Sequence, residues 1–155
     1  AYKLMKRELE IVDWNIMWEL VETETYIDDL SKTASSHLSQ PEKLLNDTYN
    51  IMLESDFILA VAIGFEPNFF PEKGYWFEPR CVRRDSQLVK EQIGGPDHDY
   101  FKMDWYQQGM EKTGNGMFWT SPYIDHSQND EAIISLIQPL FADSTHVAGV
   151  MCIDV

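Results

Sequence analysis

Aromatic and carboxylate side chains are concentrated in the second half of the sequence, in a pattern that suits a binding pocket. One run covers residues 100–106 and contains Trp105 and Tyr106, and another covers residues 119–125 and contains Tyr123 and Asp125. Tryptophan and tyrosine join a large apolar ring to one hydrogen-bonding atom, and such residues commonly line small-molecule sites. They also occur in filled protein cores, where the polar atom finds a buried partner. The pattern leaves both interpretations open.

Ser121, Asp125 and His126 bring together the residue types of a hydrolase, namely a nucleophile, an orienting acid and a base. Their spacing matches no known nucleophile motif. No Gly-x-Ser-x-Gly elbow precedes a helix, and Pro122 follows the serine directly. Polar residues near a turn usually form the turn, so we expect that this domain is not an enzyme, with a small hydrolase as the weakest alternative.

The sequence contains no strong motif for a metal ion or a nucleotide. Acidic residues flank histidines in Asp97-His98-Asp99 and in Asp125-His126, but the spacing is neither that of a zinc-binding helix nor that of a calcium loop. The glycine cluster Gly94-Gly95-Pro96 lacks the lysine and hydroxyl residue of a phosphate-binding loop. We therefore expect no metal and no cofactor.

Cys81 and Cys152 are the two cysteines of the chain. Two residues are too few for a disulfide framework, and they lack the paired spacing of metal ligands. One disulfide bridge and two inert buried thiols are equally compatible with the sequence.

The size and charge of the chain exclude several classes of protein. Its 155 residues suit one domain, and 44% hydrophobic residues are enough to form a core. The formal charge of -14 opposes binding to nucleic acid, which needs a surface rich in lysine and arginine. The longest apolar run, residues 57–65, is far shorter than the ~20 residues that cross a bilayer.

The first half of the chain has helical periodicity. Residues 1–40 contain neither glycine nor proline, and we expect a long helix over residues 1–31. Its early apolar residues follow heptad spacing, which favours either pairing with a second helix or burial in a core. They are Tyr2, Met5, Leu9, Val12 and Ile16. A later stripe is expected to pack on the domain itself; it comprises Met17, Leu20, Val21, Ile27 and Leu30. A second helix is predicted over residues 41–54.

The periodicity then changes to that of strands, which predicts an α+β fold with a roughly five-stranded antiparallel sheet over residues 57–155. The continuous apolar run 57–65 indicates a central strand. The other predicted strands cover residues 75–83, 117–120, 132–141 and 146–155, the last two forming a hairpin. Residues 84–99 read as a polar loop with a helical turn at 86–92, residues 106–112 as a short helix, and residues 113–116 as a turn.

Three segments resemble the Cache sensor domains of bacterial signalling proteins. These domains carry a Trp-Tyr pair, then a Pro-Tyr-(Ile/Phe/Val)-Asp segment, then a terminal Gly-Val-x-x-x-Asp strand. The corresponding residues here are Trp105-Tyr106, residues 122–125 and residues 149–154, in the same order and at similar spacing. The resemblance covers the whole chain and implies a single PAS-like domain. It looks most like sensor modules of Bacteroidetes-type membrane kinases and phosphatases.

The resemblance also implies ligand-binding residues. They are Trp105, Tyr106, Tyr123 and Asp154. In the amino-acid-binding branch of the family, an arginine two residues before the tryptophan grips the ligand carboxylate, but Met103 stands there in this sequence. Other cations would have to replace it, either Lys102 or one of Arg80, Arg83 and Arg84. An amine or another polar metabolite therefore fits better than a standard α-amino acid, because Asp154 suits a cationic or hydroxyl donor.

The resemblance implies a ligand-sensing domain in the periplasmic or other extracytoplasmic part of an inner-membrane protein with a histidine kinase, phosphatase or similar output. Binding would shift the population of two conformations and transmit the change across the membrane. The expected partners are a small molecule and a second copy of the chain, through the opening helix. The alternative is an interaction or dimerisation module in which the pocket is a filled core.

Overall fold

The computed structural model describes residues 2–111, 116–126 and 130–155, apart from the side chains of Tyr2, Leu4, Leu9 and Val12. Its centre is a six-stranded antiparallel sheet in the order β3-β2-β1-β8-β7-β4. The strands of this sheet are β1 (Ala60–Phe65), β2 (Pro79–Arg84), β3 (Gln87–Gln92), β4 (Phe118–Trp119), β7 (Ser135–Phe141) and β8 (Val147–Asp154). A separate pair joins β5 (Tyr123–Ile124) to β6 (Ala132–Ile133). The α+β expectation is confirmed, with one strand more than predicted in the main sheet.

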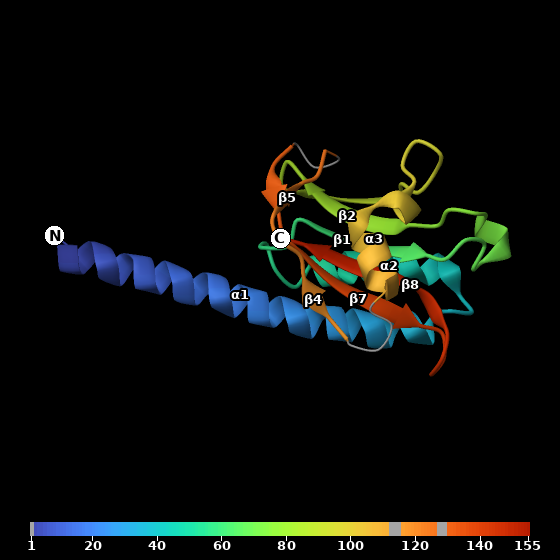
Figure 1. Ribbon diagram of the computed structural model, residues 1–155, viewed down its shortest axis with the longest axis horizontal. Coiled ribbons are helices and arrows are strands. Elements are labelled where there is room, and N and C mark those ends of the chain that lie inside the picture. Colours follow the sequence, from blue (N-terminus) through green and yellow to red (C-terminus); the bar gives the residue numbers. More distant parts are fainter. Residues whose placement is uncertain (1, 112–115, 127–129) are drawn as a thin grey trace.

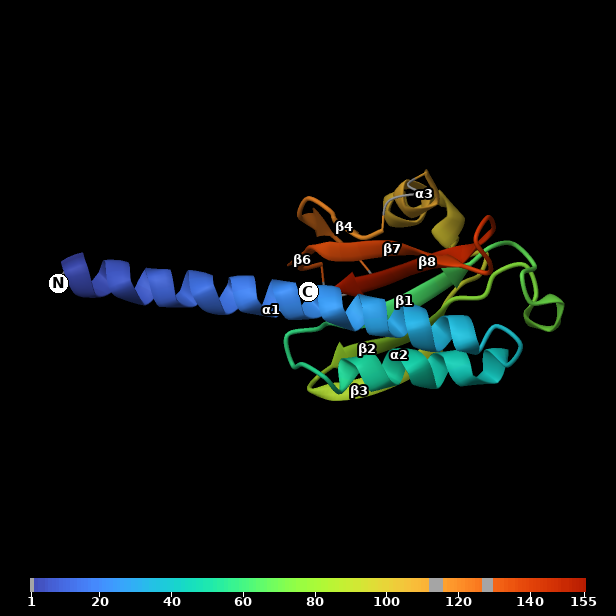
Figure 2. The same ribbon diagram turned by 90° about the horizontal axis from the view of Figure 1, so that it is seen from below.

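Helices cover the two faces of this sheet unequally. The helices α1 (Tyr2–Ser36) and α2 (Leu44–Met52) lie on one face, and α3 (Asp104–Glu111) lies on the other (Figure 2). Short 3-10 turns at Pro41–Lys43, Pro71–Lys73 and Tyr100–Lys102 connect these elements. The second predicted helix thus begins as the turn at Pro41 and continues as α2.

Helix α1 is longer than predicted, because it continues to Ser36 instead of ending at Ser31. Its N-terminal half extends well beyond the rest of the molecule (Figure 1). Its C-terminal half packs on β7 and β8, where Ile27, Leu30 and Ala34 are fully buried. The added turn follows from this packing, since Ala34 belongs to the same buried face as Leu30.

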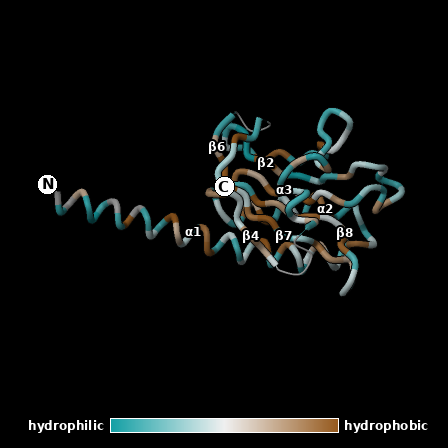
Figure 3. The backbone as a smooth tube through the Cα atoms, in the orientation of Figure 1, coloured by the Kyte–Doolittle hydropathy of each residue, from teal (hydrophilic) through white to brown (hydrophobic). Residues whose placement is uncertain are grey.

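The projecting half of α1 carries hydrophobic residues that remain exposed. Met5 and Ile16 of the expected heptad seam are 58% and 45% exposed, whereas the side chains of Tyr2, Leu9 and Val12 lie outside the described part. The later stripe was only partly correct. Ile27 and Leu30 are buried as predicted, but Met17 and Val21 are exposed because they lie away from the helix face that carries Thr23, Ile27 and Leu30. The hydropathy of this segment alternates along the helix (Figure 3).

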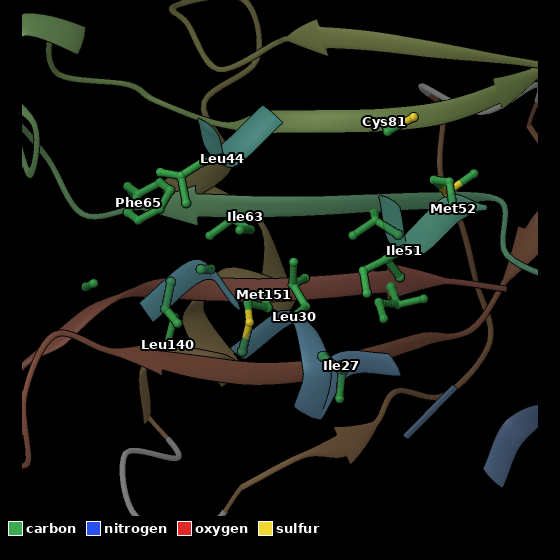
Figure 4. Close-up of a cluster of buried hydrophobic side chains, with 14 of the residues drawn as sticks. Ile27, Leu30, Leu44, Ile51, Met52, Ile63, Phe65, Cys81, Leu140 and Met151 are labelled. Carbon is green, nitrogen blue, oxygen red and sulfur yellow. The ribbon is translucent and has the colours of Figure 1, made fainter. Parts of the chain in front are cut away.

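The main core lies between the sheet and the α1–α2 face (Figure 4). Strand β1 is buried along its whole length, which confirms it as a central strand, although it begins at Ala60 instead of residue 57. Strands β7 and β8 pair antiparallel, which confirms the predicted hairpin. Leu136 and Leu140 of β7 and Met151 of β8 all contribute to this core.

Strand β3 corrects the sequence prediction. Residues Gln87–Gln92, expected to form a loop with a helical turn, pair antiparallel with β2 as an edge strand. The turn between the two strands has a positive φ at Asp85 (51°) and at Ser86 (67°). Two consecutive positive φ values favour a tight hairpin, but the sequence Asp-Ser lacks the glycine that usually marks one.

Helix α3 lies close to β8 because Gly109 faces that strand. A Cβ atom at this position would lie 2.4 Å from Cγ1 of Val150, which is inside van der Waals contact. The predicted helix over 106–112 begins two residues earlier, at Asp104. Lys112 and residues 113–115 of the predicted turn lie outside the described residues.

Two remaining expectations concern the cysteines and the membrane. Cys81 and Cys152 are both buried free thiols, so the bridged alternative is excluded. In the described ranges, no helix combines the length and apolar character that crossing a membrane requires.

Candidate ligand-binding site

A cavity of about 760 Å³ opens between α3, β4 and β5. Aromatic residues from three elements contribute to its wall, namely Trp105 of α3, Phe118 of β4 and Tyr123 of β5. Polar residues complete the rim, among them His98, Lys102, Asp104, Gln108, Asp125 and His126. This volume lies in the range typical of sites for small molecules.

A smaller chamber of about 20 Å³ adjoins the cavity and reaches down to the sheet. The two spaces share five lining residues, which are His98, Met103, Trp105, Tyr123 and Asp125. The floor of the chamber carries Glu78 and Arg80 from β2 and its approach, and Cys152 and Asp154 from β8. Polar and charged groups thus lie at the inner end, and aromatic rings lie nearer the opening.

Sheet register explains why these charged residues meet. Arg80 pairs with Ala62 of β1, and Ala62 pairs with Cys152 of β8. Side chains alternate between faces along a strand, so Glu78 lies on the face of Arg80, and Asp154 lies on that of Cys152. The small side chain of Ala62 leaves open volume between β2 and β8.

Asp154 ends a chain of hydrogen bonds that begins at the cavity wall. The hydroxyl groups of Tyr123 and Ser135 are 2.6 Å apart, and Ser135 donates to Oδ1 of Asp154 at 2.6 Å. The Cys152 thiol donates to the same oxygen at 3.2 Å. Burial raises the pKa of Asp154, and the hydrogen bonds from Ser135 and Cys152 oppose that rise.

Arg80 and Glu78 are buried beside each other, with only 4% and 2% of their surfaces exposed. Nη1 of Arg80 lies 3.4 Å from Oε1 of Glu91, while its buried Nη2 has no hydrogen-bond partner within the described ranges. Oε1 of Glu78 lies 3.3 Å from Nε2 of His98. This contact with Glu78 raises the pKa of His98, and burial raises the pKa of Glu78.

The short turn before α3 positions Trp105. Asp99 caps this turn by accepting a hydrogen bond from the backbone N–H of Phe101, and its Oδ1 also accepts one from Nε1 of Trp76. Tyr100 is fully buried and donates from its hydroxyl to the carbonyl oxygen of Phe65, at the end of β1. These contacts fix the start of α3 against the sheet, with Asp99 as the capping residue of the turn.

Three of the four residues expected from the Cache resemblance meet in this region. Trp105 and Tyr123 line both spaces, and Asp154 lines the inner chamber. Tyr106 is the exception, because it lines neither space and packs against Tyr100 and Phe101. Consecutive residues of a helix point about 100° apart, so Trp105 reaches the cavity while Tyr106 remains within the aromatic cluster that the two share with Tyr100.

Four basic residues were considered as replacements for the arginine that would bind a ligand carboxylate. The structure places them in different surroundings. Arg83 donates to backbone carbonyl groups of residues 52, 55 and 58, and Arg84 pairs with Glu91. Lys102 lies at the outer rim and is largely exposed. Arg80 alone among them lines the inner chamber. Met103 also lines both spaces and presents an apolar side chain at the position where the Cache resemblance implied a carboxylate-binding arginine.

Sequence reasoning missed Glu78 as a site residue. A buried charge at alternate positions of a strand has no pattern that separates it from an exposed polar face. The hydrolase candidates Ser121, Asp125 and His126 all line the outer cavity, where Nδ1 of His126 lies 2.5 Å from Asp130. The described ranges contain no group of three or more acidic, histidine or cysteine residues placed to bind a metal ion.

Comparison with known families gives a match over most of the chain. The family described as methyl-accepting chemotaxis protein-like, first PDC sensor domain, matches residues 45–155. No curated protein sequence matches the chain significantly.

Several solved structures share the fold. The extracellular domain of soHK1S-Z6, described as a histidine kinase, has a TM-score of 0.74 at 23% identity and aligns over 89% of this chain and 53% of its own. The ligand-binding domain of the Campylobacter jejuni chemoreceptor Tlp3 in complex with L-valine has a TM-score of 0.67 at 17% identity, over 90% and 53% of the two chains. The ligand-binding domain of Mlp24 with asparagine has a TM-score of 0.63 at 18% identity, over 90% and 50%. The chain spans about half the length of these structures.

Proposed function

We propose that this chain, which belongs to the methyl-accepting chemotaxis protein-like, first PDC sensor domain family, binds a small polar molecule in the cavity beside α3. Sensor domains of this family are not catalytic, so the chain is a sensor domain and not an enzyme. One observation carries the proposal. Three buried charged residues, Glu78, Arg80 and Asp154, converge on open volume behind an aromatic wall. A filled core would place apolar groups there, because buried charge is costly without partners.

The ligand we expect is an amine or another polar metabolite. Trp105 and Tyr123 supply aromatic surface, and Asp154 supplies a buried carboxyl group at the inner end. Chemoreceptor domains of the same fold hold L-valine and asparagine, which supports a ligand of metabolite size. Met103 supplies no charge for a carboxylate, which argues against the amino-acid arrangement of the related receptors.

The chain is expected to lie outside the cytoplasmic membrane, as the periplasmic part of an inner-membrane signalling protein. The soHK1S-Z6 structure is an extracellular domain, which supports this location. Because the chain spans about half of such structures, the output of the complete protein also belongs to this proposal.

The conformational change caused by ligand binding would reach α1 through the strands that carry the site. Asp154 on β8 and Ser135 on β7 lie on strands that contact α1 on their opposite face. A ligand that binds one arrangement of α3, β5 and the sheet more tightly shifts the population toward it. The position of α1 against β7 and β8 would change with that population.

A thermal-shift screen tests the proposal. The compounds are amines, amino acids, short carboxylates and sugars, and the proteins are the parent and the variant Asp154→Asn. Asp47→Asn is a matched control, because Asp47 is also a buried carboxyl group (5% exposed) but lies in α2, on the other face of the sheet. At ~100 times its Kd, a ligand should stabilise the parent and the control by roughly 2.7 kcal/mol.

The result we expect is a compound whose stabilisation is lost in Asp154→Asn only. Equal stabilisation of all three proteins would place the ligand elsewhere. A complete lack of hits would favour the interaction module.

A specific observation supports that second function, association through α1. The projecting half of the helix exposes Trp14 by 76% and Trp18 by 63%, together with Ile11 and Val21. These four residues recur at intervals of three and four, which places them along one face of the helix. Exposed apolar surface of this kind marks interaction sites, and a second copy of the chain is the partner that we propose.

A further inference from the structure

The inner chamber selects among the chemical groups that a ligand can present. Its volume of about 20 Å³ exceeds the ~10–15 Å³ that one water molecule needs, but it is far too small for a whole metabolite. One small polar group of a ligand in the outer cavity therefore fits the chamber.

Arg80 requires an acceptor in this chamber. The guanidinium group is buried, Nη1 is held by Glu91, and Nη2 has no hydrogen-bond partner in the described part of the chain. An unpaired buried donor is destabilising and rare in folded proteins. Such a group commonly marks a position that a ligand or an ordered water completes.

Glu78 requires a donor at the same place. It precedes Arg80 by two residues, directly before β2 begins, and its Oε1 is buried without an aligned hydrogen bond, although His98 lies 3.3 Å away. A group between these side chains therefore meets a donor from Arg80 and an acceptor from Glu78.

We propose that the inner chamber is a hydroxyl-binding subsite, in which a ligand hydroxyl accepts a hydrogen bond from Arg80 Nη2 and donates one to Glu78 Oε1. The inference rests on the proposed ligand-binding function and, among the amines and other polar metabolites considered there, selects a small polyol or sugar. An ammonium group accepts no hydrogen bond and places a second positive charge beside Arg80. A carboxylate donates none and meets the carboxyl groups of Glu78 and Asp154.

The aromatic wall agrees with a hydroxylated ligand. Trp105 and Tyr123 line both spaces, so a ring or carbon chain in the outer cavity can contact their apolar surfaces while one hydroxyl enters the chamber.

Isothermal titration calorimetry with matched probes tests the subsite. The probes are glucose, glucosamine and glucuronate, the same series from galactose, and myo-inositol. We expect a neutral probe to bind the parent protein most tightly, and Arg80→Gln and Glu78→Gln each to weaken its binding by about tenfold or more. Arg84→Gln is the matched control, since Arg84 lies on β2 and also pairs with Glu91 but lines neither space.

A second arm leaves the protein unaltered, in case Arg80→Gln fails to fold. Deoxy analogues of the neutral probe, each lacking one hydroxyl, should show a single position whose removal weakens binding by about tenfold. Uniform small losses over all positions would overturn the subsite.

The outcomes separate this inference from the proposed function. Tighter binding of an amine or a carboxylate probe, with dependence on Asp154, would support the proposed function and overturn the hydroxyl subsite. If a neutral probe binds Arg80→Gln as tightly as it binds the parent, that result would also support the proposed function and overturn the hydroxyl subsite. If no probe and no compound of the wider screen binds, both are overturned.

Discussion

Nε1 of Trp119 donates a hydrogen bond to Oε1 of Glu24, at 3.0 Å, and so joins the cavity wall to the long helix. The two residues are 95 positions apart in the sequence. Trp119 belongs to β4 and lines the outer cavity, while Glu24 lies in the part of α1 where packing on the sheet begins. A change at the cavity wall therefore has a direct contact through which it can reach α1.

Glu24→Ala is expected to lower the free energy of unfolding by about 1 kcal/mol, because it removes the acceptor for the Trp119 indole. Urea unfolding followed by tryptophan fluorescence measures the change. Glu24→Gln should recover most of the loss, since its side-chain oxygen can still accept. The control is Glu10→Ala, at an exposed position on the projecting half of α1, and it should leave stability unchanged. An equal loss in both alanine variants would contradict the assigned contact.

Gly109→Ala is expected to cost about 1–3 kcal/mol of stability, because the added Cβ would lie 2.4 Å from Val150 Cγ1 and would force α3 away from β8. Gly95→Ala, where no atom lies within 4 Å of the added carbon, is the matched control. The double variant Gly109→Ala/Val150→Ala should be less destabilised than the sum of the two single changes. Thermal unfolding of the four variants measures these differences, and strict additivity would rule out the contact.

Asp154 should make stability depend on pH. Burial raises its pKa, opposed by hydrogen bonds from Ser135 and Cys152. Arg80 and Asp125 also act on it, Arg80 lowering and Asp125 raising its pKa. Because the folded-state pKa exceeds the unfolded value of about 4, the stabilising contribution is full below that value and is lost as the pH rises through the folded-state pKa.

Asp154→Asn removes this titration. The stability of the variant relative to the parent should therefore increase as the pH rises from about 4 to 8, as measured by urea unfolding at several pH values. A stability difference that is independent of pH, or that moves in the opposite direction, would show that the carboxyl group is not desolvated.

Association through α1 should depend on its exposed tryptophans. Sedimentation velocity over a range of concentrations is expected to show self-association of the parent that Trp14→Glu/Trp18→Glu abolishes, because charge replaces the exposed apolar face. Leu53→Glu changes a residue of similar exposure (60%) away from this face and should have no effect. Unchanged association in the double variant would exclude this face as the contact.

The sequence predicted the elements whose periodicity was strong. The buried run of β1 and the β7–β8 hairpin are continuous apolar segments, and α1 has no helix-breaking residue before Pro41. Strand β3 was missed because an edge strand with polar residues has no clear alternation, and because its turn lacks glycine.

Only those site residues that belong to a recognisable sequence motif could be predicted. Trp105, Tyr123 and Asp154 came from the resemblance, and each lines the cavity or its inner chamber. Arg80 and Glu78 depend on the register of β2 against β1, which a single sequence does not reveal. Tyr106 shares the motif and the hydrophobic cluster of Trp105, but the helical rotation between neighbours keeps it out of the cavity lining.

Binding in the cavity is the central claim, and the five tryptophan side chains provide the most direct measurement of it. In a ¹H–¹⁵N correlation spectrum, each indole N–H gives its own signal, assigned by single Trp→Phe substitutions. A saturating hit from the thermal-shift screen should shift the signal of Trp105, which lines the cavity, and leave those of the exposed Trp14 and Trp18 in place. Shifts confined to Trp14 and Trp18, or stabilisation with no change at Trp105, would contradict the account.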